Sequence, residues 1–522
     1  SFYGITITMP GLCGMCHHSP ETGRLKYSGK PVYWKEQFFL DYHYNLGDRT
    51  SVIDTKIIPQ APCLDSDALD ILKMVFGSDA NFRSGKQKDA MLSVLNKRNN
   101  HRAILLGCGA GKTILALAST LEAHMRGTMK SMTILVAPHI NLVGHQIGQI
   151  KSLLNKVHKS SDEEDNISVE HFTTLGNILP PSLNGEHLPH IAVMSIMAFS
   201  SLVKFHHNKM QWWYDHGFLG HVFLDEIQLM TSEGTIRKEY ECLSTIASVG
   251  APVTLLSGSL SKGILGVLAD YLGLRSSTTP IDVIIGNDLV GTHFNFEVRS
   301  KPRFAVLGVV EYAKQRMTTC HVHILCATTT AAREIHSAMS DCPKVACIIG
   351  ADDANKKMAT AEEWRNGDIT VLISSTCALV GNENSKCRHI MIVDCIYDLS
   401  NLIQAMGRLR AEQGGEDTFV TQFLSEEEMM DDVDTAKAST SKINELRNMG
   451  LQIDSVIDEV KMQLTVQGYS SFFRKEGCLL KNLSHIFGGD RQGDCKKCTN
   501  CDSFYNTTNA TIRRVPLFLQ PN

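Results

Sequence analysis

Short apolar runs rich in β-branched residues alternate with helical periodicity over most of this chain, and this alternation restricts the fold more than any other feature. Strand, helix and strand at such spacing predict parallel sheets with crossover helices, which is the α/β class. The runs of a first series are 103–106, 133–136, 191–194, 221–224 and 253–256, and those of a second are 323–326, 345–348, 370–373 and 389–393. Two α/β domains in tandem are therefore predicted. Residues 276–302 between them lack a helical pattern, and we interpret them as a hinge.

Length and composition exclude several classes of protein. The 522 residues exceed what one hydrophobic core organises. Apolar residues make up 43% and charged residues 20%, which excludes a disordered or collagen-like chain. The net charge of −4, from 51 Lys plus Arg against 55 Asp plus Glu, excludes a globally basic nucleic-acid binder. It does not exclude a locally basic groove.

Neither a membrane span nor a secretion signal is predicted. No apolar run reaches the ~18–20 residues that a membrane helix needs, so we expect a soluble protein without a membrane partner. Most of the sixteen cysteines stand singly in apolar segments, which is typical of free thiols in a reducing compartment. The chain starts at Ser1 rather than Met, as a fragment or a processed product would.

The turn after run 103–106 has the composition of a phosphate-binding loop. It reads Gly107-Cys108-Gly109-Ala110-Gly111-Lys112-Thr113 and leads directly into a helical segment. Glycines let backbone N–H groups surround phosphates at a helix N-terminus, and Lys112 is expected to reach the β- and γ-phosphates of ATP. The Thr113 hydroxyl would bind Mg²⁺. The alternative is a glycine-rich turn that binds no nucleotide.

Two acidic residues complete the expected nucleotide site. Asp225 and Glu226 directly follow run 221–224, about 110 residues after the glycine-rich turn. We expect Asp225 to hold Mg²⁺ and Glu226 to take the proton from the attacking water. An Asp-Glu pair without such a turn would instead be interpreted as the end of a strand.

Several further segments resemble the RecQ family of superfamily 2 helicases. The resemblance assigns adenine recognition to Arg83 and Gln87, and contact with single-stranded nucleic acid to 137–142 with Gln146. Asp225-Glu226-Ile227-Gln228 stands at the DExH position with Gln228 in place of His, and 257–259 stands for motif III.

The second series of runs carries the remaining family motifs. Residues 324–328 resemble motif IV, and 364–368 with 373–376 and Gly381 resemble motif V. Gln404-Ala405-Met406-Gly407-Arg408-Leu409-Arg410 resembles motif VI. This implies that Gln404 and Gly407 help to bind the nucleotide and that Arg408 and Arg410 face the γ-phosphate.

Four cysteines near the end of the chain have the spacing of a zinc site. Cys478 is followed by Cys495, Cys498 and Cys501, with two-residue spacers in the triplet. The segment also resembles the RecQ zinc-binding subdomain. The predicted fold class is thus α/β, with two tandem RecA-like parallel-sheet domains followed by a small helical zinc-binding subdomain. The predicted bounds are 1–65 for an N-terminal segment to which no fold is assigned, then 66–280, 281–430 and 431–522.

The resemblance implies an ATP-dependent DNA helicase or translocase that moves 3′ to 5′ in the nucleus. Two departures leave alternatives open. In the loop Leu229 to Tyr240, Glu233 and Ile236 stand where the family has Trp and Phe, and Arg410 falls one residue early. A degenerate relative that only binds DNA, and a DNA-stimulated ATPase that does not unwind, therefore remain as hypotheses.

The N-terminal segment holds a separate cysteine pair. Cys13-Gly14-Met15-Cys16-His17 matches the sequence motif of a c-type haem attachment site. That chemistry needs export to an oxidising compartment, which nothing in the sequence supports. A zinc half-site completed by His43 or Cys63 is a second interpretation, and an unliganded segment is the third.

Overall fold

The computed structural model describes residues 16–19, 24–27, 30–32 and 65–501, except 97–99, 108, 126–130, 139, 159–166, 173–178, 180–182, 184–187, 234–237, 276–280, 287–293, 302–305, 377–383, 410–417, 426–432, 488 and 490–492. The chain divides into two units, Ser1–Ala61 and Pro62–Asn522. No described helix is long and apolar enough to span a membrane.

The first unit contains a small antiparallel sheet of β1 (Cys16–Ser19), β2 (Arg24–Tyr27) and β3 (Lys30–Val32). Cys13, His43 and Cys63 of the hypothetical half-site lie outside the described residues, and only the backbone of Cys16 is described.

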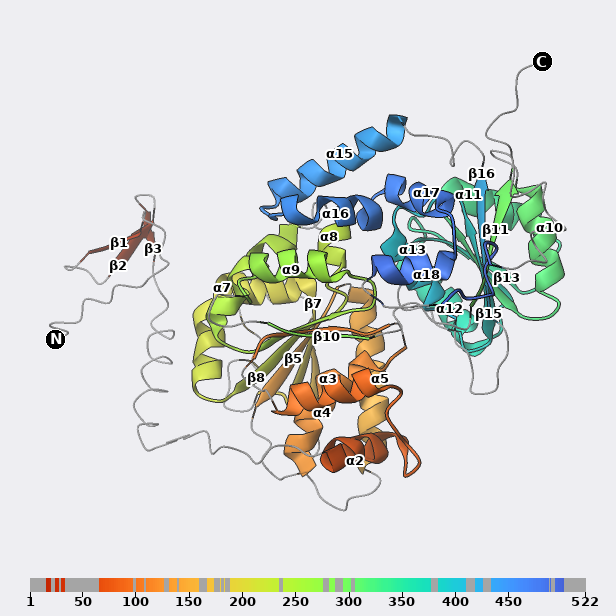
Figure 1. Cartoon of the computed structure of the whole chain (residues 1–522). Coiled ribbons are helices and arrows are strands. Elements are labelled where there is room, and N and C mark those ends of the chain that lie inside the picture. Colours follow the sequence, from red (N-terminus) through yellow and green to blue (C-terminus); the bar gives the residue numbers. More distant parts are fainter. Residues whose placement is uncertain are drawn as a thin grey trace. The chain divides into compact units, whose positions relative to one another are not determined.

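The second unit begins with a seven-stranded parallel sheet in the order β10-β4-β9-β8-β5-β7-β6 (Figure 1). All six strand pairs are parallel, as the alternation of strand and helix predicts. Its strands are β4 (Arg102–Leu105), β5 (Met132–Ala137), β6 (Val169–Phe172), β7 (Ile191–Ser195), β8 (Leu219–Leu224), β9 (Val253–Ser257) and β10 (Asp282–Ile285).

Helices cover both faces of this sheet because successive strand residues point to opposite faces and both sets are apolar. Ile104 and Phe223 belong to one apolar cluster with α2 (Asp65–Phe76), α3 (Gly85–Asn96), α4 (Lys112–Met125) and α5 (Ile140–His158). Ala103 and Val222 belong to a second cluster, with α7 (Ile196–Asp215), η1 (Lys238–Val249) and α9 (Lys262–Tyr271). The short α8 (Leu229–Glu233) follows β8.

A second parallel sheet has the order β11-β16-β15-β12-β14-β13. Its strands are β11 (Phe294–Lys301), β12 (His321–Cys326), β13 (Val345–Ile348), β14 (Val371–Ser375), β15 (Cys387–Val393) and β16 (Thr418–Ser425). The accompanying helices are α10 (Leu307–Arg316), α11 (Thr329–Ala338), α12 (Ala354–Asn366) and α13 (Leu399–Met406). Side chains of Thr328, Asp353 and Asp398 accept backbone N–H groups at the starts of α11, α12 and α13, which fixes where these helices begin.

The interpretation of residues 276–302 as a hinge needs correction. This stretch contains β10, which pairs with β4 in the first sheet, and β11, which pairs with β16 in the second. The first sheet therefore extends beyond the predicted boundary at residue 280. The pattern of the sequence did not reveal these two strands.

Helices complete the second unit: α15 (Val433–Asn448), η3 (Asp454–Val456), α16 (Ile457–Leu464), α17 (Val466–Arg474) and α18 (Leu479–Ile486). They take part in the apolar cluster that includes one face of each sheet. Leu268 of α9, Leu402 of α13 and Val460 of α16 are all buried members of it. The helical subdomain, residues 433–501, is thus packed into the same core as both sheets.

Candidate nucleotide site and metal centre

The glycine-rich turn connects β4 to α4 at the carboxyl edge of the first sheet. Gly109 and Gly111 have positive φ values of 79° and 84°, which glycine adopts without steric cost. Lys112 Nζ donates to the Leu106 carbonyl at 3.0 Å and lies 3.5 Å from the Gly107 carbonyl. The lysine charge is thereby held over the loop where phosphates would bind. Thr113 follows in the first turn of α4, and Cys108 lies outside the described residues.

The residues predicted to recognise adenine lie against this loop. Gln87 is buried at the start of α3, where its Oε1 accepts the Arg83 backbone N–H at 2.7 Å. The Arg83 guanidinium donates to the Gly109 carbonyl. A hollow of about 440 Å³ opens beside them and is lined in part by Phe82 and Ser84. Residues far from the loop in sequence are therefore brought next to it.

Gly111 is further restricted by Gln87. A Cβ atom on Gly111 would overlap the side-chain amide of Gln87. The positive φ requires glycine at the position, and any side chain there would also displace the Gln87 amide.

Asp225 and Glu226 follow β8 at the same edge of the sheet. The Asp225 amide donates to the Val136 carbonyl at 3.0 Å, and Asp225 Oδ1 accepts the Glu226 N–H at 3.0 Å. Gln146 Nε2 donates to Asp225 Oδ2 at 2.8 Å. Gln146, which the RecQ resemblance assigns to nucleic-acid contact, is thus directed at this carboxylate. The Gln146 Oε1 is buried without a hydrogen-bond partner among the described residues.

Burial, and after it the neighbouring Glu226 charge, raise the pKa of Asp225 to about 7, although the charge of Lys112 opposes both effects. Two adjacent carboxylates in a buried setting favour a bound cation because its charge offsets their desolvation. Carboxylate and hydroxyl oxygens are also the ligands that Mg²⁺ prefers. Asp225 with Thr113 therefore fits the expected magnesium site.

Glu226 is joined to both domains by hydrogen bonds. Its Oε2 accepts from Gln228 Nε2 at 2.6 Å, and Gln228 Oε1 accepts from Ser257 Oγ at 2.7 Å. From α13, Gln404 Nε2 donates to the same Oε2 at 3.2 Å and lies 3.5 Å from Ser259 Oγ. The candidate general base is thus held by amides from two domains.

The structure places the other predicted residues of the motif VI segment less directly. Gly407 ends α13, where its N–H donates to the Ile403 carbonyl at 2.9 Å. Arg408 is buried, and its charge adds to the effect of burial in lowering the pKa of His323 to about 4. Arg408 therefore lies near the second sheet. Arg410, Ile236 and Gly381 lie outside the described residues, and of Glu233 only the backbone is described.

The sequence did not reveal one further contact of this site. Ser400 Oγ, in the first turn of α13, donates to the Ser259 carbonyl at 3.1 Å and so supports the approach of Gln404. A serine in the first turn of a helix has a common local role there, and this hides its longer-range partner.

The four cysteines form one cluster at the end of the helical subdomain. The Sγ atoms of Cys478, Cys495, Cys498 and Cys501 all lie within 4.8 Å of one another. Backbone N–H groups of Lys481 and Cys495 donate to Cys478 Sγ at 3.4 and 3.2 Å. Hydrogen bonds from the neighbouring thiol of Cys495 lower the pKa of Cys498 to about 5, which favours a thiolate. Four soft donors at this separation fit tetrahedral Zn²⁺.

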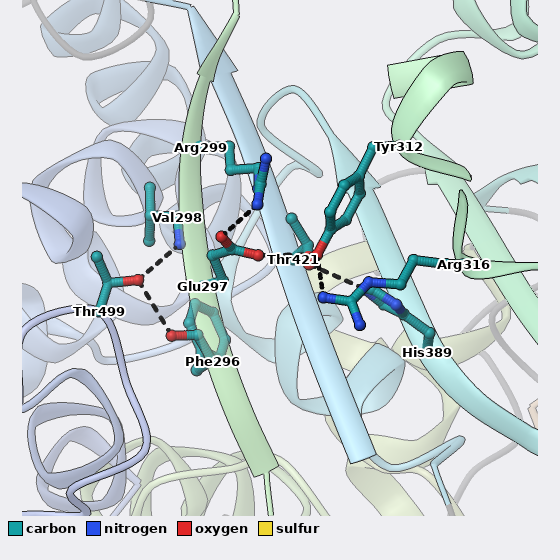
Figure 2. Close-up of polar contacts among 9 residues, drawn as sticks. All are labelled: Phe296, Glu297, Val298, Arg299, Tyr312, Arg316, His389, Thr421 and Thr499. Atoms are coloured by element: carbon teal, nitrogen blue, oxygen red, sulfur yellow. Dashed lines mark hydrogen bonds and ion pairs between the residues drawn. The ribbon is translucent and has the colours of Figure 1, made fainter. Parts of the chain in front are cut away.

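The cysteine loop is anchored to β11 of the second sheet. Figure 2 shows Thr499 between two backbone groups of that strand: its Oγ1 accepts from the Val298 N–H at 2.9 Å and donates to the Phe296 carbonyl at 3.2 Å. Phe296 and Cys498 also form a parallel bridge. From β11, Glu297 accepts a hydrogen bond from Tyr312 of α10 at 2.9 Å.

Comparison with known families agrees with the fold of two parallel-sheet domains. The DEAD/DEAH box helicase family matches residues 84–265, and the helicase conserved C-terminal domain matches residues 307–411. These two domains indicate a superfamily 2 helicase. The matched ranges include strands of both sheets, and the helicase core is of the ATP-dependent, nucleic-acid type. A search of curated proteins found no match.

Solved helicase structures share the fold at low sequence identity. The DEAD-box helicase Mss116 bound to single-stranded RNA is 14% identical, with a TM-score of 0.57, and the match covers 81% of this chain and 90% of that one. The helicase MrfA bound to DNA is 13% identical, with a TM-score of 0.54 and coverage of 74% and 54%. Lhr of Mycobacterium smegmatis, bound to single-stranded DNA, is 12% identical, with a TM-score of 0.52 and coverage of 79% and 55%.

The Gly111→Ala variant tests the restriction on the glycine-rich loop. A left-handed conformation costs a non-glycine residue about 1–2 kcal/mol, so we expect at least about fivefold weaker binding of an ATP analogue in a fluorescence titration. Gly85→Ala is the matched control, because a Cβ there meets no atom within 4 Å. Equal affinity of Gly111→Ala and wild type would contradict the assignment of this loop to phosphate binding.

The Cys498→Ser variant tests the metal centre. We expect it to lose about one bound zinc per chain, measured by elemental analysis, and to unfold at least about 5 °C lower because metal binding contributes to folding. Cys342→Ser is the control, since Cys342 lies outside the cluster. A zinc content that is unchanged in Cys498→Ser would show that the cluster is not the ligand set.

Proposed function

We propose that this superfamily 2 helicase is an ATP-dependent DNA helicase or translocase of the RecQ type that moves 3′ to 5′. The observation that carries the proposal is that two features occur together in this chain. Glu226 is held by amides from both domains, and a four-cysteine cluster follows the second sheet. The direction of movement and a nuclear location rest on the RecQ resemblance alone.

ATP hydrolysis would use the residues at the carboxyl edge of the first sheet. Lys112, over the glycine-rich loop, would neutralise phosphate charge, and Gln87 with Arg83 would orient the base. A magnesium ion bound through Asp225 and Thr113 would supply further charge on the phosphates. Glu226 would take the proton of the attacking water, and the amides of Gln228 and Gln404 direct its carboxylate.

The two domains would couple turnover to movement through Gln404. Because this amide projects from the second domain and contacts Glu226 of the first, a change in the separation of the domains changes the setting of the base. Nucleotide binding would favour one separation and hydrolysis another. Two nucleic-acid contacts that move alternately produce translocation.

Binding to DNA rather than RNA belongs to the proposal. The structural neighbours include helicases bound to RNA, Mss116 and Dbp5, and helicases bound to DNA, MrfA and Lhr. The RecQ-like cysteine cluster favours DNA. We expect contacts mainly with phosphates and therefore binding that weakens strongly with salt.

A second candidate function is a DNA-stimulated ATPase that does not unwind, or a scaffold that only binds DNA. The altered residues Glu233 and Ile236 favour it, since the RecQ family has Trp and Phe there. Unwinding of duplex DNA separates a helicase from both forms of this candidate. ATP turnover separates the two forms from each other.

Steady-state ATP hydrolysis with and without single-stranded DNA tests the proposal. Glu226→Gln should lower kcat by about 10²- to 10⁴-fold because it removes the general base, and Lys112→Ala should abolish turnover. Single-stranded RNA of the same sequence is the control for nucleic-acid type. Wild-type turnover no higher than that of Lys112→Ala, with either nucleic acid, would refute the ATPase assignment.

Duplexes with a single 3′ or 5′ tail test the direction of movement. The proposal expects unwinding of the duplex with the 3′ tail and none of the duplex with the 5′ tail, with Lys112→Ala as the blank. DNA-stimulated hydrolysis without unwinding of either duplex would establish the second candidate.

A further inference from the structure

The helical subdomain contacts the first domain at the turn between β9 and α9. Ser261 caps α9, and its Oγ accepts the Ile264 N–H at 3.3 Å. Two side chains of α16 bind this residue. Gln463 Oε1 accepts the Ser261 N–H at 3.2 Å, and Glu459 Oε2 accepts from Ser261 Oγ at 2.6 Å.

Gln463 also connects this turn to the cysteine cluster. Its Nε2 donates to the Ile486 carbonyl at 2.9 Å, at the end of α18. That helix begins directly after Cys478, one of the four clustered cysteines. Since the Gln463 side chain is only 1% exposed, both ends of its amide depend on these protein partners.

The same turn leads to the candidate general base. Ser261 stands two residues after Ser259, whose hydroxyl lies 3.5 Å from the Gln404 amide. The same Gln404 amide donates to the Glu226 carboxylate. Leu260, between the two serines, is buried, so a shift of Ser261 is transmitted to Ser259.

Glu459 of α16 reinforces the contact at the first turn of α9. A Cβ on Gly263 would overlap the Glu459 carboxylate, so this carboxylate lies directly against the first turn of the helix. A negative charge is favourable at that end of a helix. Figure 1 shows α16 beside α9.

A second helix of the subdomain, α15, contacts the segment that follows Asp225 and Glu226. Lys442 of α15 donates to the Ser232 carbonyl at 3.1 Å, in the short helix α8 that follows Gln228. The hairpin of α15 and α16 therefore holds both segments that leave the site, one after β8 and one after β9.

We propose that Gln463, supported by Glu459, is a positioning residue for ATP turnover. Through Gln463, the subdomain that carries the cysteine cluster holds Ser259 in position. Ser259 in turn positions Gln404, and Gln404 positions Glu226. This inference rests on the proposed ATPase activity and adds to it a dependence on residues outside both sheets.

The Gln463→Met variant of the full chain tests the inference. Methionine fills the same space and removes both hydrogen bonds. With single-stranded DNA present, we expect kcat for ATP hydrolysis to fall about tenfold while KM stays within about twofold, because the base is misplaced and the nucleotide loop is not. Zinc content and the unfolding temperature are measured on the same samples. Asp458→Asn is the control, since that side chain lies on the same helix and is 95% exposed.

Glu459 provides a second pair of variants that is less demanding for folding. Glu459→Ala should lower kcat in the same direction, and Glu459→Gln should retain it because the amide oxygen still accepts from Ser261. Wild-type turnover equal to that of Lys112→Ala would refute the proposed function, and the inference with it. An active wild type, with Gln463→Met and Glu459→Ala equal to it, would overturn the inference alone. A fall in kcat matched by a fall in bound zinc would assign both residues to folding and would also overturn it.

Discussion

The structure depends on how two adjacent carboxylates, Asp225 and Glu226, are accommodated in a partly buried position. Charged groups away from water must be paired or hydrogen-bonded, and here the partners come from distant parts of the chain. Gln146 of α5 contacts Asp225. Glu226 is contacted by Gln228, which directly precedes α8, and by Gln404 of α13. The hydrogen bonds to these two carboxylates therefore fix the relative positions of Gln146 and Gln404, which are more than 250 residues apart in the sequence.

The parallel sheets make this arrangement accessible. In a parallel sheet all strands end at the same edge, so a loop after β4, an acidic pair after β8 and the serines after β9 meet without any special contact between them. The hydrogen-bonded side chains then refine what topology has already brought near. Amides serve this purpose well because they donate to a carboxylate at one end and accept from a hydroxyl at the other, as Gln228 does.

The sequence predicted the parts of the fold and site that follow a local pattern. Strands β4, β5, β7, β8 and β9 coincide with apolar runs, whereas β6 was missed because only one of its four residues is buried and no apolar run marks it. Lys112 and the acidic pair were found by composition and spacing. Ser400, Gln463 and Thr499 were not, because each acts through partners remote in sequence and none of them belongs to a periodic pattern.

Thr499 has a consequence for the second sheet that concerns protection rather than catalysis. β11 is an edge strand, and an edge strand exposes unpaired N–H and C=O groups on which another chain can pair. The Thr499 hydroxyl and the bridge at Phe296 occupy part of that edge. The cysteine loop thus covers part of the β11 edge. Removal of this loop would expose the edge to strand addition by another chain.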